Sequence, residues 1–409
     1  MNFQLRTKPK VTPKLSMTSK ISLWLMSAIL LIGLPLLGLP LADTDLLAYL
    51  EFPPLTQYVA HAPFDPLAFV IIGTLDLVMV IGLLSVFKLG FHRCGPSRSN
   101  HQRKGVFPAW GGLAIAIMII GWVLAWTRFP WFEPLQPHTF CLPWIGYILL
   151  VNALCIARSG HSLLTDAPVR FLLLWPASAV FWWFFEYLNR FVQNWYYVGV
   201  DAFSPLEYIF HASLAFATVL PAVLSTHRLL LTYDIFKIGF KSLASISFFD
   251  YRSTAGAILL ISGTGLALIA KYPDYLYPLV WSAPLLVITS LHTLWGKPTL
   301  FTGLKHGDWR ALIAVATAAL ICGFFWELWN FRSLARWEYA VPFVDRYHIF
   351  AMPVLGYGGY LPFGWECLLV GQMIIGNRLL GLPSHSGQNT QSMPFSPSDM
   401  DPGRHTAPS

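Results

Sequence analysis

Long apolar runs dominate this chain of 409 residues, and they constrain its fold more than any other feature. A helix needs roughly 20 apolar residues to cross the hydrocarbon core of a bilayer. Only 11% of the residues are charged, whereas soluble domains carry about 25%. We therefore expect an all-α integral membrane protein with about ten transmembrane helices. The predicted spans lie near residues 21–42, 66–88, 108–127, 142–157, 169–188, 206–226, 254–270, 277–295, 309–329 and 347–376.

The basic residues are distributed unevenly between the two sides of these spans. If the N-terminus is cytoplasmic, 21 of the 27 Lys and Arg residues fall in cytoplasmic segments, as the positive-inside rule requires. The net charge of +7 thus reflects membrane topology, and we expect no nucleic-acid partner. We predict cytoplasmic N- and C-termini and, as the location, the inner (plasma) membrane of a bacterium.

The two ends of the chain differ from its apolar middle. Residues 1–20 are basic and polar, and residues 383–409 are rich in Ser, Pro and Gly, so we expect a cytoplasmic basic tail and a disordered C-terminal tail. Residues 21–105 would form two N-terminal transmembrane helices and a basic loop. The first apolar run could also be a signal peptide. Its length and its poor cleavage signal favour an uncleaved anchor.

A repeated phrase divides the remainder of the chain. "FFEYLNRFVQNWYY" begins at Phe184, and "FFWELWNFRSLARWEY" begins at Phe324. Each contains a Glu, an Asn three residues later and then Trp-x-Tyr. The similarity extends upstream, because Trp144 precedes Asn189 by 45 residues and Trp281 precedes Asn330 by 49. We therefore predict an internal parallel duplication of a four-helix unit, at residues 106–230 and 252–378, and duplicated membrane folds often bind ligands between the copies.

The repeated acids are the first candidates for a functional site. Glu186 and Asn189, like Glu327 and Asn330, share one helix face. A carboxylate in a membrane span faces a cavity, pairs with a partner or is protonated. A purely structural role remains open, in which each Glu ties its helix end to the Trp-x-Tyr segment that follows.

Two further acids lie in predicted spans. Glu366 belongs to "YLPFGWE", in a last span that is rich in Gly and Pro and is therefore expected to be broken. Irregular backbone at membrane depth is tolerated where it is buried or lines a cavity. Asp76 lies near the middle of the second span, where either a helix-packing bond or a functional role would explain it.

Aromatic residues accompany these acids. We predict a substrate-binding set that consists of Asn189, Asn330, Trp195, Trp337, Tyr339, Trp326 and Trp365. Aromatic faces near carboxylates could stabilise a carbocation by cation–π attraction, or they could simply be core. The five cysteines and the histidines show no ligand spacing, so we expect no metal and no cofactor.

Two segments of the second unit resemble a known family. "ELWNFRSLARWEY", from Glu327 to Tyr339, and "YLPFGWE", from Tyr360 to Glu366, are similar to parts of the membrane-embedded lycopene cyclase domain and, more loosely, of small membrane terpene cyclases. The resemblance implies a helical bundle in which acidic residues protonate an isoprenoid and start a cofactor-free cyclisation. The family has Pro-x-Glu-Glu and three-span units, whereas this chain has one acid, Glu366, after Pro362 and four spans per unit. The chain as a whole also resembles bacterial multi-pass membrane proteins without an assigned activity.

Our leading functional hypothesis is a cofactor-free membrane enzyme that protonates or cyclises an isoprenoid or other lipid substrate. Glu327, Glu366 and Glu186 are its predicted catalytic carboxyls. Its expected partners are membrane lipids and a lipophilic small-molecule substrate. Two alternatives remain: a transporter or channel with a Glu/Asn relay between the repeats, and a structural membrane protein without catalytic activity.

Overall fold

The computed structural model describes residues 17–42, 44–54, 57–94 and 105–382. The predicted tails and the basic loop at residues 95–104 lie almost wholly outside these ranges. The first helix, α1 (Met17–Leu37), begins a few residues inside the predicted N-terminal tail. It is continued by a short 3-10 helix, η1 (Leu39–Ala42), and packs against two helices of the second half of the chain, α10 and α12.

Six helices in the described part of the chain are long and apolar enough to cross a membrane, and the count rises to eight if each of two bent helix pairs forms one span. The protein is therefore membrane-embedded. The six are α1 with η1, α3 (Pro66–Cys94), α5 (Cys141–Ser159), α7 (Pro168–Val192), α8 (Pro205–Phe216) together with α9 (Val219–Leu230), and α13 (Arg310–Asn330).

The bent pairs explain part of the difference from the ten predicted spans. α4 (Trp110–Trp126) meets η2 (Pro130–His138) at 105°, and the segment Pro273–Trp281 meets α12 (Ala283–Leu294) at 60°. That segment consists of α11 (Pro273–Leu276) and η5 (Tyr277–Trp281). Prolines at or near both breaks remove backbone N–H donors and favour a change of direction. Two further helices are shorter: α10 (Arg252–Leu268) has 17 residues and α14 (Tyr360–Ile374) has 15.

The predicted last span, 347–376, is an α-helix only in its second half. Its first half contains two strands of two residues each, β3 (His348–Ile349) and β4 (Met352–Pro353), and a 3-10 helix, η7 (Val354–Gly359). The broken helix expected from the Gly and Pro residues is thus observed, with α14 beginning only at Tyr360.

Short elements connect these helices. They are α2 (Leu46–Leu50), α6 (Leu163–Asp166), β1 (Trp195–Val198), the π-helix η3 (Ile235–Gly239), η4 (Phe248–Asp250), η6 (Leu300–His306) and β2 (Arg336–Tyr339). β1 pairs with β2, and β3 pairs with β4, both antiparallel.

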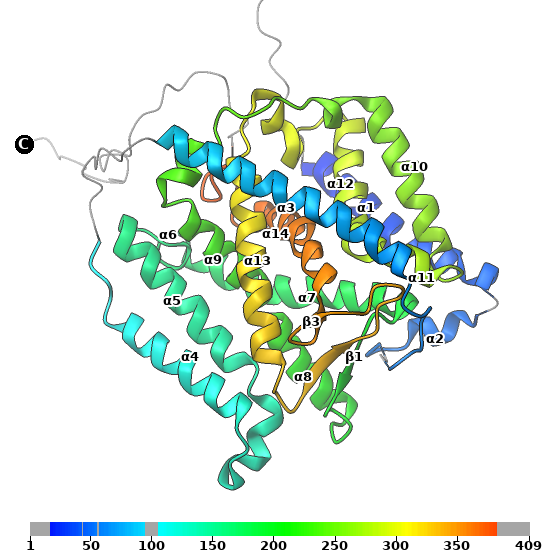
Figure 1. Ribbon diagram of the computed structural model, residues 1–409, viewed down its shortest axis with the longest axis horizontal. Helices are drawn as coiled ribbons and strands as arrows, with labels where there is room; N and C mark the ends of the chain where they lie inside the picture. The colour runs from blue at the N-terminus through cyan, green and yellow to red at the C-terminus, as the bar shows by residue number, and fades with distance from the viewer. Residues whose placement is uncertain (1–16, 43, 55–56, 95–104, 383–409) are drawn as a thin grey trace, which may run out of the picture.

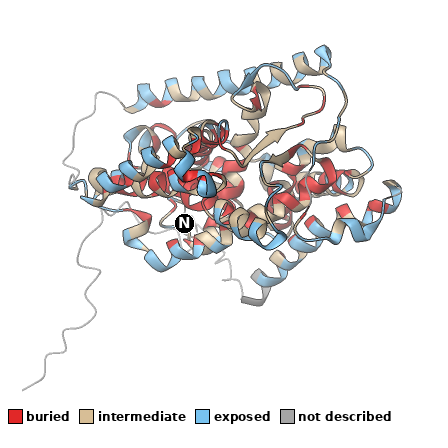
Figure 2. Ribbon diagram, turned by 90° about the horizontal axis from the view of Figure 1, so that it is seen from below, coloured by how far each residue is buried: buried red, intermediate tan, exposed pale blue. Residues whose placement is uncertain are grey.

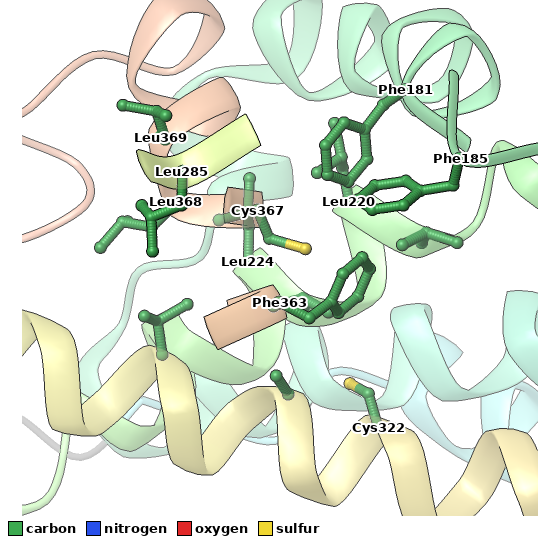
Figure 3. Close-up of a cluster of buried hydrophobic side chains, with 14 of the residues drawn as sticks. Phe181, Phe185, Leu220, Leu224, Leu285, Cys322, Phe363, Cys367, Leu368 and Leu369 are labelled. Atoms are coloured by element: carbon green, nitrogen blue, oxygen red, sulfur yellow. The ribbon is translucent and has the colours of Figure 1, made fainter. Parts of the chain in front are cut away.

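The buried core is built around α13 and α14, which cross near the centre of the molecule (Figure 1). Small residues allow this approach, since a methyl group on Gly364 would lie 2.7 Å from the backbone oxygen of Val315. Figure 3 shows the surrounding side chains, from α7, α9, α12, α13 and α14: Phe181, Phe185, Leu220, Leu224, Leu285, Cys322, Phe363, Cys367, Leu368 and Leu369. Figure 2 shows exposed residues around much of the periphery, and many of them are large and apolar, as expected for surfaces that face lipid.

Gly146 sets the approach of α4 and α5, which lie side by side in Figure 1. A methyl group there would lie 2.4 Å from the Met118 backbone nitrogen, whereas one on Gly112 would have no neighbour within 4 Å. We expect Gly146→Ala to lower the free energy of unfolding by about 1–3 kcal/mol, because the helices must separate. Gly112→Ala, the matched control, should not destabilise the protein. Thermal unfolding in detergent measures both, and equal stabilities of the two variants would contradict this packing.

Candidate functional site

The two Trp-x-Tyr segments pair with each other. β1 and β2 run antiparallel, with Trp195 opposite Tyr339, Tyr197 opposite Trp337, and Tyr196 opposite Glu338 at the centre. The Tyr196 hydroxyl donates a hydrogen bond of 2.9 Å to Glu338 Oε2. Each tryptophan of one segment therefore faces a tyrosine of the other, and segments about 140 residues apart meet in one short sheet.

The first carboxylate cluster surrounds Glu186 near the C-terminal end of α7. Its side chain is 1% exposed. Its Oε1 atom accepts hydrogen bonds from the indoles of Trp182 and Trp195, both at 3.0 Å, and from the Tyr197 hydroxyl at 2.6 Å. The α7 helix and β1 thus both donate to one oxygen atom.

The second carboxylate cluster surrounds Glu327 near the C-terminal end of α13. Its Oε1 atom accepts hydrogen bonds from the hydroxyls of Tyr339, at 2.6 Å, and Tyr360, at 2.9 Å. The Trp337 indole donates to the Tyr339 oxygen at 2.8 Å. The buried Oε2 atom has no hydrogen-bond partner among the described residues. Gly323 makes room for this arrangement, since a methyl group there would lie 2.5 Å from the Tyr360 ring.

Each asparagine of the repeated phrase holds the backbone of its strand. Asn330 donates to the Trp337 carbonyl at 2.8 Å and accepts from the Trp337 N–H at 2.9 Å. Asn189 donates to the Trp195 carbonyl and accepts from the Asn194 N–H, both at 2.8 Å. Both asparagines are fully buried, so these amides position the strands and do not face a ligand.

The tyrosines of the strands remain hydrogen-bond donors. Burial, together with the Glu186 carboxylate, raises the pKa of Tyr197 well above its ordinary value. Burial and Glu327 do the same to the pKa of Tyr339. A raised pKa favours the neutral phenol. Both hydroxyls therefore keep their protons across the physiological pH range.

A cavity of about 540 Å³ lies beside both clusters. Its volume is in the range of sites that hold drug-sized ligands. It is lined by the hydrogen-bond partners of both glutamates, so the tyrosines and tryptophans separate the carboxyls from the cavity. Five tryptophans contribute to its wall: Trp182, Trp195, Trp281, Trp326 and Trp337.

Two stacked histidines form another part of the wall. The rings of His138, from η2, and His211, from α8, lie 3.8 Å apart with an interplanar angle of 20°. Phe203 also stacks on His138, with ring centroids 5.3 Å apart. In the part of the chain that the structure describes, no three His, Cys, Asp or Glu residues form a group that could hold a metal ion.

Two predicted site residues lie away from the cavity. Glu366 is buried between α14 and α12, where its Oε1 atom accepts from the Leu285 N–H at 3.2 Å. That N–H belongs to the first turn of α12, so Glu366 occupies the position of an N-terminal cap. The Trp365 indole donates to the Leu312 carbonyl at 3.1 Å and likewise does not line the cavity.

The remaining predicted site residues line the cavity or contact a residue that lines it. Some residues of the cavity wall, however, were not predicted. Tyr197, Tyr360, Trp281 and the histidine pair were absent from the predicted site. Tyr197 was recognisable as the tyrosine of the first Trp-x-Tyr. Nothing in the sequence pattern brings His138 and His211 together.

Comparison with known proteins found no relative of this chain. No protein-family model matches the chain, and neither a curated protein nor a solved structure does.

Proposed function

We propose that this protein is a membrane enzyme that binds a lipophilic, isoprenoid-type substrate in the cavity and starts its conversion by protonation. The observation that carries the proposal is the layering of the wall. Hydroxyls and indoles line the cavity, and buried carboxyls lie directly behind them. Such a wall provides aromatic surface to an apolar substrate and places a proton source next to it.

Glu327 is the proposed source of the proton. When its carboxyl is protonated, the 2.6 Å contact with Tyr339 or the 2.9 Å contact with Tyr360 can carry that proton to the phenol oxygen. The phenol proton then moves to a carbon of the substrate double bond. Because the phenol gains one proton as it gives up its own, it stays neutral, so the tyrosine acts as a relay and Glu327 becomes the carboxylate. The carbocation later returns a proton to a base, so substrate and product are isomers.

The tryptophans supply the second requirement of this chemistry. A carbocation must be stabilised where water is excluded, and the negative face of an indole attracts positive charge. Five tryptophans in one wall provide such faces from several directions. In this proposal Glu186 orients Trp182, Trp195 and Tyr197 and supplies no proton, because three donors already converge on one of its oxygens.

We further propose that residues 106–230 and 252–378 are duplicated units that meet at the cavity. Support comes from the matching roles of Glu186 and Glu327, and of Asn189 and Asn330, and from the pairing of β1 with β2. If α10 and α14 also cross the membrane, the six helices and two bent pairs become ten spans. The charge distribution then favours cytoplasmic termini in a bacterial inner membrane.

Lipid analysis tests this function. A strain that lacks the gene is compared with the same strain complemented by the wild-type protein, and total lipid extracts are examined by mass spectrometry. We expect an isoprenoid to accumulate in the deletion strain and an isomer of equal mass to appear on complementation. Unchanged lipid profiles, with the complementing protein present in the membrane, would contradict the enzyme and favour transport.

A further inference from the structure

The helix α3 crosses the front of the molecule in Figure 1 and presents most of its surface outward. Between Val70 and Leu84 all residues are exposed except four, which are partly buried: Ile72, Gly73, Asp76 and Leu83. The first three lie on one face of the helix, because they are separated by one, three or four positions. Asp76 is therefore turned toward the protein, although most of the helix surface is apolar and exposed.

Asp76 is not itself a lining residue of the cavity, but its neighbours along the helix and across from it are. Ile72 and Met79, four residues before it and three after it, both line the cavity. Across from it lies Gly358 of η7, which also lines the cavity, and a methyl group on Gly358 would lie 2.8 Å from Asp76 Oδ1. The absence of a side chain at Gly358 thus leaves space for the carboxylate.

Asp76 has no structural partner that would explain its position. No residue in the described ranges forms a hydrogen bond or ion pair with it. Tyr277, another residue that lines the cavity, lies close enough to Asp76 to interact with it electrostatically. A carboxylate in a membrane span is costly unless it has a partner, so an unpaired one points to a ligand.

We propose that Asp76 binds the positive charge of the molecule that occupies the cavity, which makes that molecule, or its reacting form, a lipophilic cation. This inference rests on the cavity being the binding site of the proposed function. Aromatic faces attract a cation but carry no net charge, whereas Asp76 adds a negative charge directly beside the same cavity. In the proposed reaction this cation is the carbocation that forms after protonation.

The charge can be tested with a stable mimic. The probe is N,N-dimethylfarnesylamine, which is protonated at neutral pH, and its comparison is the neutral hydrocarbon in which carbon replaces nitrogen. Binding of both to the purified full-length protein in lipid nanodiscs is measured by tryptophan fluorescence. We expect the wild-type protein to bind the amine at least about tenfold more tightly than the hydrocarbon. Asp76→Asn should remove this preference, and Asp76→Glu should retain it.

Glu133→Gln is the matched control, because it neutralises an exposed acid that does not line the cavity and should leave the preference unchanged. Equal binding of the amine and the hydrocarbon by the wild-type protein would overturn the inference. This result does not depend on whether the variants fold. An unchanged preference in Asp76→Asn would also overturn it. The measurement needs no turnover, so its failure is distinct from unchanged lipid profiles, which would refute the proposed enzyme itself.

Discussion

Replacing Glu327 with glutamine should reduce product formation by about 10²- to 10⁴-fold, the usual contribution of a general acid. Glutamine retains the shape of the side chain and an oxygen that accepts from Tyr339 and Tyr360, but it cannot supply the proton that starts the reaction. We therefore expect normal folding and normal ligand binding with very slow turnover. Isomer formation from the accumulated lipid in membranes containing equal amounts of protein measures the effect.

Three comparisons make this result specific. Glu133→Gln, on the exposed surface, should keep the wild-type rate. Tyr339→Phe and Tyr360→Phe each remove one relay, so each should lose less activity than the double variant, which should approach Glu327→Gln. Glu186→Gln should affect turnover less than Glu327→Gln does. A folded Glu327→Gln protein with wild-type turnover would rule out Glu327 as the acid.

Removing the Asn330 amide should cause the largest loss of stability, about 2–4 kcal/mol in the free energy of unfolding. Alanine at this position loses two hydrogen bonds and leaves the N–H and C=O of Trp337 without partners. Because Trp337 lies in β2 and lines the cavity, ligand binding should weaken as well. Thermal and denaturant unfolding in detergent provide the measurement.

Asn194→Ala is the matched comparison for this loss. Asn194 is also buried beside the strands, but its amide makes one long bond of 3.4 Å to the Ala340 carbonyl, and its side-chain oxygen has no partner among the described residues. Its removal should therefore cost clearly less than that of Asn330. Equal losses for the two variants would mean that general packing, and not the strand bonds, determines the effect.

Local sequence patterns predicted the parts of this fold that depend on local chemistry. The apolar runs predicted the helices, because burial in lipid requires long apolar segments with internal hydrogen bonds. The Gly and Pro residues before Tyr360 predicted the break before α14 for the same local reason. The spacing of Glu and Asn placed Glu186 with Asn189 and Glu327 with Asn330 on shared helix faces, and the amides and carboxyls contact neighbouring residues of the same phrase.

Long-range packing decided what the patterns left open. The pairing of β1 with β2 joins distant segments through backbone hydrogen bonds, for which side-chain spacing gives no signal. Glu366 looked like Glu327 in sequence, but its helix is turned so that the carboxyl meets the first turn of α12. His138 and His211 stack only because η2 bends sharply after α4 and returns toward α8.

The central claim is that the cavity holds a lipophilic substrate whose double bond receives a proton from Glu327. The most direct test runs the reaction in D₂O with purified protein in nanodiscs and the isoprenoid that accumulates in the deletion strain. The account predicts a product that has the mass of the substrate in H₂O and carries one added deuterium in D₂O, at a rate that Glu327→Gln lowers by about 10²- to 10⁴-fold. A product without deuterium, or an unchanged rate of deuterium incorporation with Glu327→Gln, would contradict it.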